Sequence, residues 1–184
     1  MEEFLEFLAV EACEYEIKDG TVIVLDTLSP VEAHFENVVI PENTDFTEGL
    51  DLKYYEGEIQ LPENLKVGFG LDLSNTSIKR LPSNLTIYDN CSVYLNAHKI
   101  ENVSYRENCG FGRRTIFAFW ANNEFLIAAG CFAGTYSDFE EQVNEEYRLY
   151  NTLATKYKRS ARDCISELVE KLGKPDPFKK ATVN

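Results

Sequence analysis

The chain has 184 residues, of which 44% are hydrophobic and 12% aromatic, and its 31 acidic and 18 basic side chains give a net charge of −13. This composition excludes a disordered or collagen-like chain, and the length suits one or two compact units. All of the net charge lies in residues 1–100, which hold 19 acidic and 6 basic side chains, whereas residues 101–184 hold 12 of each. Such a field repels nucleic acid and attracts a basic protein surface, although acidic residues also serve simply as solvated surface.

The chain has no basic N-terminal segment and no stretch near the roughly 18 to 20 apolar residues that cross a bilayer. We therefore expect neither secretion nor membrane insertion. The five cysteines are odd in number, widely spaced and without a CxxC pair, which indicates neither a disulfide framework nor a zinc site. We expect a cytoplasmic protein without a metal or cofactor.

Residues 1–39 are expected to form an N-terminal cap. The segment "EEFLEFLAVEAC" (2–13) has apolar residues at helical spacing behind glutamates that favour a helix N-terminus. The segment "CEYEIKDGTVIVLDT" (13–27) predicts two alternating strands joined at Asp19-Gly20, a strong hairpin signal. The run Val-Ile-Val-Leu (22–25) is also a candidate for a degenerate first copy of the repeat that follows.

Residues 40–102 contain three aligned segments: "IPENTDFTEGLDLKYYEGEIQ" (40–60), "LPENLKVGFGLDLSNTSIKR" (61–80) and "LPSNLTIYDNCSVYLNAHKIEN" (81–102). Each begins Ile/Leu-Pro-x-Asn and continues to an apolar-x-Leu triplet, which predicts a short strand with two apolar side chains pointing inward. Proline cannot donate to a strand ladder, so it belongs on another side of the coil. Stacked coils would bury their apolar residues in one column of parallel strands, closed by caps at both ends.

The stretch "LDLSNTSIKRLPSNL" resembles a leucine-rich repeat of the short bacterial type. The resemblance covers residues 40–102 and implies a short leucine-rich solenoid, a fold class that carries many unrelated functions. The block from 100 to 143 is also similar to the C-terminal part of phage-encoded leucine-rich proteins, which implies a phage or prophage gene product but no reaction.

Residues 103–173 are expected to form a C-terminal cap of one hairpin and two helices. "RTIFAFWANNEFLIAAG" (114–130) predicts two strands joined at Ala121-Asn122-Asn123. In "TYSDFEEQVNEEYRLYN" (135–151), Ser137 and Glu140 match a capping box, and a second helical pattern follows as far as Gly173. Residues 174–184 are expected to be a flexible tail.

The strongest candidate site lies on the exposed face of the predicted strands. Asp51 and Asp72 occupy the middle positions of consecutive triplets, so stacking should place their carboxylates roughly 5 Å apart, with Tyr94 next in the row. With Lys53 and Tyr54 beside them, these residues form a predicted partner-binding surface, since solenoids usually bind on the strand face. Solvated surface is an equal alternative for the same residues.

A cleft between the repeats and the C-terminal cap is the second candidate site, with His98, Cys109, Arg113 and Arg114 as its residues. A thiolate activated by a histidine would be nucleophilic, and two arginines would suit a nucleotide. The competing interpretation is a cysteine that packs under a turn and arginines that pair with acidic neighbours. The loop "CGFGRR" precedes a strand instead of opening a helix, which is the wrong context for a phosphate-binding loop.

The sequence also bears on two other functions. Leucine-rich repeats of this type resemble those of bacterial effector ubiquitin ligases, whose catalytic domain uses a Cys-x-Asp nucleophile, but no cysteine here is followed by x-Asp. The basic run from Lys156 to Arg162 suits either nucleic-acid contact or, more simply, a solvated helix face.

The sequence as a whole predicts a non-enzymatic, phage-derived module whose acidic repeat face binds a basic surface of a host protein. A nucleic-acid-handling defence complex is the target class we expect, with the acidic surface acting as a nucleic-acid mimic in the manner of an anti-CRISPR inhibitor. The alternatives are a small-molecule or nucleotide-binding protein or enzyme that uses the cleft, and a purely structural virion or dimer component.

Overall fold

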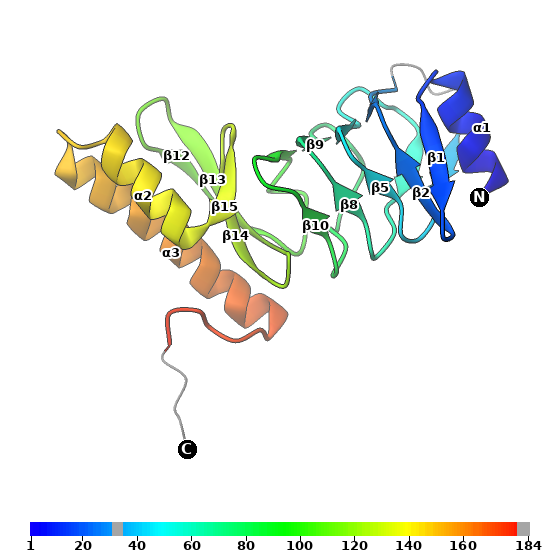
Figure 1. The fold of residues 1–184 in the computed structure, drawn as a ribbon. Coiled ribbons are helices and arrows are strands. Elements are labelled where there is room, and N and C mark those ends of the chain that lie inside the picture. The colour runs from blue at the N-terminus through cyan, green and yellow to red at the C-terminus, as the bar shows by residue number, and fades with distance from the viewer. Residues whose placement is uncertain (31–34, 180–184) are drawn as a thin grey trace.

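The computed structural model describes residues 1–30 and 35–179, and shows an α/β protein built on a parallel-strand β-solenoid of about three turns with helices at both ends. Helix α1 (Glu2–Val10) lies at one end of the elongated molecule, and the helices α2 (Tyr136–Glu146) and α3 (Asn151–Leu172) lie at the other (Figure 1). The last five residues of the expected flexible tail, 180–184, lie outside the described residues.

The N-terminal elements follow the sequence pattern. Helix α1 buries Phe4, Phe7 and Leu8 against the end of the solenoid. Strands β1 (Tyr15–Lys18) and β2 (Thr21–Val24) form the predicted hairpin, in which Lys18 pairs with Thr21 across the Asp19-Gly20 turn. Both turn residues have positive φ, which is why Asp-Gly suits this position.

In the described part of the chain the solenoid has three columns of short strands, whereas the sequence predicted one. The predicted column is the sheet β3 (Thr27–Leu28), β6 (Gly49–Asp51), β9 (Gly70–Leu73) and β11 (Ser92–Leu95). A second column contains β2, β5 (Asp45–Phe46), β8 (Lys66–Val67) and β10 (Thr86–Ile87), and a third pairs β4 (Asn37–Val39) with β7 (Glu58–Gln60). Since β2, β3 and β4 each pair with the following coil, the degenerate first copy considered from the sequence is a real coil.

The apolar side chains of each coil stack in register inside the solenoid. Leu28, Leu50, Leu71 and Val93 are aligned by the strand pairing, and each is almost fully buried. Burial of each such side chain contributes about 1.5 to 3 kcal/mol, which no single coil could obtain alone. The prolines of the repeats lie outside the strands, as expected from their missing N–H.

The C-terminal sheet has four strands, so the expected single hairpin was wrong. Its order is β12 (Ser104–Cys109), β13 (Arg114–Ala121), β14 (Glu124–Ala129) and β15 (Phe132–Thr135), all antiparallel. The predicted hairpin is β13–β14, and both turn residues, Asn122 and Asn123, have positive φ. The outer strands were missed because β12 is mostly polar and β15 contains no β-branched residue before its last position.

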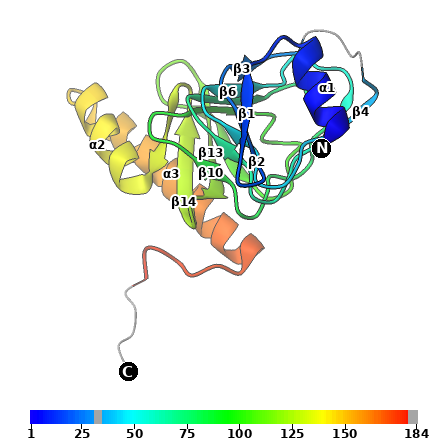
Figure 2. The same cartoon turned by 45° about the vertical axis from the view of Figure 1, so that its right-hand side comes forward.

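This sheet lies between the solenoid and the helices (Figures 1 and 2). Along β13, Phe117, Phe119 and Ala121 belong to the solenoid core, whereas Ile116 and Ala118 belong to the core under α2 and α3. Because successive side chains of a strand point to opposite faces, one face of β13 belongs to the solenoid core and the other face belongs to a second core under the helices.

The N-cap of helix α2 lies two residues earlier than the sequence suggested. Its N-cap is Thr135, which forms a capping box with Asp138, so the predicted box of Ser137 and Glu140 was wrong. Thr135 ends strand β15 in an extended conformation, and this places it at the N-cap before Ser137 is reached. Helix α3 ends at Gly173 in the left-handed conformation, as predicted.

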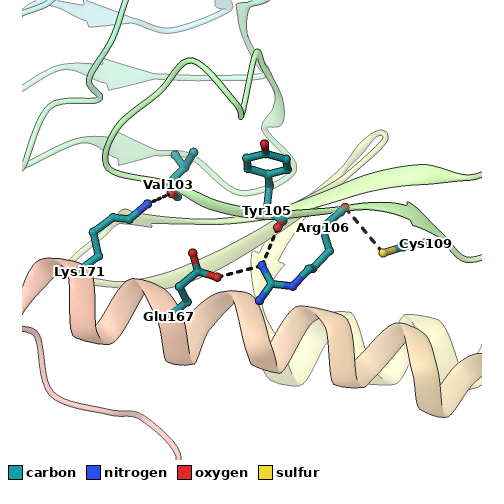
Figure 3. Close-up of polar contacts among 6 residues, drawn as sticks. All are labelled: Val103, Tyr105, Arg106, Cys109, Glu167 and Lys171. Carbon is teal, nitrogen blue, oxygen red and sulfur yellow. Dashed lines mark hydrogen bonds and ion pairs between the residues drawn. The ribbon is translucent and has the colours of Figure 1, made fainter.

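Polar contacts join α3 to β12 (Figure 3). Arg106 donates hydrogen bonds to the Tyr105 carbonyl at 2.8 Å and to Glu167 at 2.9 Å, and Lys171 Nζ donates to the Val103 carbonyl at 2.7 Å. The start of the expected tail also makes contacts, because Phe178 packs against Tyr136 at 5.0 Å and the Arg162 guanidinium lies 4.5 Å from the Phe178 ring centre.

Within the described ranges no helix is long and apolar enough to span a bilayer.

Candidate functional site

Asp51, Asp72 and Tyr94 lie side by side on the outer face of the predicted strand column. Asp51 pairs with Asp72, and Asp72 pairs with Tyr94, in consecutive parallel strands. At the usual strand spacing of about 4.8 Å the three side chains form a row roughly 10 Å long. We call this row the acidic strip, and its register is the one expected from the repeat alignment.

Each carboxylate of the acidic strip also has a local structural role. Asp51 Oδ1 accepts a hydrogen bond from the Lys53 N–H at 3.0 Å, and Asp72 Oδ1 accepts one from the Ser74 N–H at 2.8 Å. These Asx turns end the strands and explain how two like charges are tolerated in register. Among the described residues the second oxygen of each carboxylate has no hydrogen-bond or ion-pair partner, so it is available to a bound cation.

Lys53 and Tyr54 flank the strip at the end of β6. Tyr54 is 63% exposed, and Lys53 Nζ lies 5.0 Å from the centre of the Tyr54 ring. The pKa of Lys53 is raised, first by its contact with the Tyr54 hydroxyl and then by the charges of Asp72 and Asp51. An exposed aromatic ring beside free carboxylates is suited to bind an arginine or lysine of a partner.

The strip ends at a cavity between the last coil and the C-terminal sheet. This cavity has a volume of ≈ 280 Å³ and is lined by Tyr94, His98, Tyr105 and Glu107 among others. A neighbouring cavity of ≈ 480 Å³ is lined by His98 together with Arg106, Glu167 and Lys171. The structure therefore brings together one predicted strip residue, Tyr94, and one predicted cleft residue, His98.

The other predicted cleft residues lie elsewhere. Cys109 is buried in the second core, and its thiol donates to the carbonyls of Arg106 and Glu107 at 3.7 and 3.5 Å. Arg113 lies in the β12–β13 turn and Arg114 at the start of β13, both exposed. Neither arginine forms an ion pair in the described part of the chain, and neither shares a cavity with His98. The structure does not gather these four residues in one cavity, and Arg114 shares its face of β13 with Ile116 and Ala118, which belong to the core under α2 and α3.

The buried cysteines are packing residues. Burial raises the pKa of the Cys91 and Cys164 thiols to about 12, so both stay protonated at neutral pH. All five cysteines are free thiols. Within the described ranges no three His, Cys, Asp or Glu side chains are arranged to hold a metal ion.

Half of the basic run on α3 is engaged within the protein. Lys158 Nζ lies 3.3 Å from Glu140 and donates to Asn144 at 2.9 Å, and Arg162 lies against Phe178. The remaining members, Lys156 and Arg159, are exposed or nearly so. These contacts favour the solvated-face interpretation over a nucleic-acid surface.

The fold and site together define a parallel β-solenoid with an acidic strand face and a C-terminal sheet-and-helix unit. No protein-family model, curated protein or solved structure matches the chain.

Proposed function

We propose that the protein is a non-enzymatic binding module that docks a basic surface of a partner protein on its acidic strip. The observation that carries the proposal is the register of Asp51, Asp72 and Tyr94 on one outer strand face, in the half of the chain that holds the whole net charge of −13. Oppositely charged surfaces steer association and set the orientation of docking.

We further propose that the repeats are leucine-rich repeats of a phage-encoded protein, and that the partner is a nucleic-acid-handling host protein such as a defence complex. The repeat phrase and the C-terminal resemblance support the origin. A protein surface that binds nucleic acid is basic, so an aligned row of carboxylates would compete for it as phosphates do. A cytoplasmic location follows from the same proposal.

The test is capture of partners from bacterial lysate by the tagged protein, with and without nuclease and at two salt concentrations, read by mass spectrometry. We expect a nuclease-resistant partner whose capture weakens at high salt, because exposed charges are screened. The double variant Asp51→Lys with Asp72→Lys should lose this partner. The matched control is Glu16→Lys with Glu58→Lys, which makes the same change in charge on other faces of the solenoid and should retain it.

If the strip variant captures the partner as well as the parent does, with the same salt dependence, the proposed mechanism fails. Calorimetric titration with nucleotides separates the proposal from the cleft alternative. We expect no saturable heat, since the arginines proposed for a nucleotide do not converge on a cavity.

A further inference from the structure

A larger cavity lies at the corner of the last coil that precedes β11. Its volume is ≈ 670 Å³, and we call it the junction groove. One wall is the corner of the last coil at residues 87–91, and the other is made by β14, β15 and the first turns of α2. Cavities of this size at the junction of two structural units are common ligand sites.

Hydrogen bonds hold the two walls together. The Asn122 side chain accepts from the Ile87 N–H and donates to the Ile87 carbonyl, both at 2.9 Å. The Asn122 N–H also donates to the Leu85 carbonyl at 2.9 Å, and Ser92 Oγ donates to the Cys131 carbonyl at 3.1 Å. Because these bonds fix the walls, the groove exists before any ligand binds, which lowers the entropic cost of binding.

Two aromatic rings in the lining of the groove, those of Tyr88 and Phe132, are held in place by contacts. The Tyr88 hydroxyl donates to Asp45 at 2.6 Å, which holds a ring that is 40% exposed. The Phe132 ring packs against Phe139 at 5.6 Å, and a Cβ at Gly134 would lie only 3.0 Å from it. These two rings supply the apolar part of a lining that is otherwise largely polar, because the aliphatic residues Leu126 and Ile87 are almost fully buried.

The charge of the groove has one sign. Among the described residues, its lining includes the carboxylates of Asp89, Glu124 and Asp138 and contains no lysine, arginine or histidine. None of the three carboxylates has an ion-pair partner among the described residues. Phosphates and nucleotides are therefore repelled, whereas a cation is attracted both by the carboxylates and by the faces of the rings.

We propose that the junction groove binds a partner segment in which two basic side chains flank an apolar one, with the apolar side chain against the partly exposed ring of Phe132. The apolar wall distinguishes such a segment from a free polyamine, which carries no side chain to cover it. This inference rests on the proposed function, because the segment would belong to the partner that also contacts the acidic strip.

The groove contains its own reporter, since Cys131 lines it and is exposed. The probe is an end-blocked Arg-Leu-Arg tripeptide, and its control is the twin with uncharged citrulline in place of arginine. The full chain is treated with N-ethylmaleimide, and alkylation of Cys131 is followed by peptide mass spectrometry. We expect the arginine peptide to slow alkylation about twofold at a concentration equal to its Kd, as half occupancy requires. Cys13, which lies outside the groove, should react at an unchanged rate.

In the double variant Asp89→Asn with Glu124→Gln, the peptide concentration that slows alkylation twofold should rise about tenfold, as expected for the loss of two exposed charge pairs. Asp138 is left in place because it caps α2. The matched control, Glu141→Gln with Glu145→Gln, removes two exposed carboxylates of α2 outside the groove and should protect like the parent. No protection by the arginine peptide, equal protection by the citrulline twin, or equal protection by spermidine would each overturn the inference.

These outcomes separate the two proposals. The tripeptide experiment probes the groove and does not involve the acidic strip. If the tripeptide gives no protection, the groove proposal fails and the result of the lysate capture is unaffected. Conversely, if the strip variant still captures the partner while the tripeptide protects Cys131, the proposed function of the strip fails and the groove remains a site for a basic segment.

Discussion

The side chain of Asn102 satisfies backbone groups at the end of the solenoid, and substitution of Asn102 tests how much this contributes to stability. Its side chain is almost fully buried, accepts a hydrogen bond from the Leu81 N–H at 2.8 Å and donates one to the Leu81 carbonyl at 2.8 Å. The amide thus replaces the peptide group that a following coil would have supplied. In Asn102→Ala, two buried backbone groups of Leu81 lose their partners.

An unsatisfied buried polar group costs about 1 to 3 kcal/mol, so we expect Asn102→Ala to lower the free energy of unfolding by about 3 kcal/mol. For a chain of this size that loss corresponds to a fall in Tm of about 6 to 12 °C. Urea unfolding followed by circular dichroism measures it. The control is Asn84→Ala, which removes an exposed contact of 3.3 Å to Asn64 and should cost less than about 0.5 kcal/mol.

A second variant, Asn102→Asp, tests the donor half of the contact. Its carboxylate can still accept from the Leu81 N–H, but it faces the Leu81 carbonyl without a proton. Burial would raise the pKa of this aspartate, so the loss of stability relative to the parent should be present at neutral pH and shrink as pH falls through that pKa. The loss in Asn102→Ala should not depend on pH. Parallel pH profiles for the two variants would refute the reasoning.

Three further predictions concern the solenoid and its junction with α3. Leu71→Ala, in the fully buried column, should cost about 3 kcal/mol in urea unfolding. Gly68→Ala should cost about 3 kcal/mol or more, or prevent folding, because its Cβ would lie 1.7 Å from the Thr47 carbonyl oxygen. The Arg106–Glu167 pair, whose side chains are 41% and 47% exposed, should show a coupling of about 0.5 kcal/mol in a double-mutant cycle. The hydrogen bond from Arg106 lowers the pKa of Glu167, so this coupling should be complete above the unfolded pKa of the carboxyl and vanish as pH falls through its folded pKa.

The repeat phrase was enough to predict one column of the solenoid. Leu50, Leu71 and Val93 alternate with outward residues at the same point of each segment, and alternation specifies both strand and register. The two hairpin turns were predictable for a similar reason, since Asp-Gly and Asn-Asn tolerate the positive φ that the turns need. These are local signals, and the fold obeys them.

The other columns could not be predicted because their strands are too short to show a period. Strands β5, β8 and β10 have two residues each, and only their stacking on neighbouring coils makes them strands. The prediction of the capping box failed for another reason, since the sequence contains two overlapping matches, Thr135 with Asp138 and Ser137 with Glu140. The end of β15, which is set by pairing with β14, decided between them.

The acidic strip and the junction groove differ in the same way, because only the strip is specified by local sequence signals. The acidic strip follows from register within the repeats, so the sequence placed Asp51, Asp72 and Tyr94 correctly. The junction groove combines residues 87–91 with residues 122–142, and no spacing rule connects these segments. Among the described residues no basic side chain lines this groove, and only the tertiary structure shows this, because the lining comes from segments far apart in the sequence.

The C-terminal unit, which was expected to be a cap, also contributes side chains to the core of the solenoid. One face of its sheet places Phe117, Phe119 and Leu126 in the solenoid core, so deletion of the unit would expose that core. Truncation therefore cannot separate a capping role from a binding role. The side chains of Leu126 and Asn122 belong to both, since each contacts the solenoid and also lines the groove. Only substitutions that spare the core, such as those at Asp89 and Glu124, can test binding while the cap stays intact.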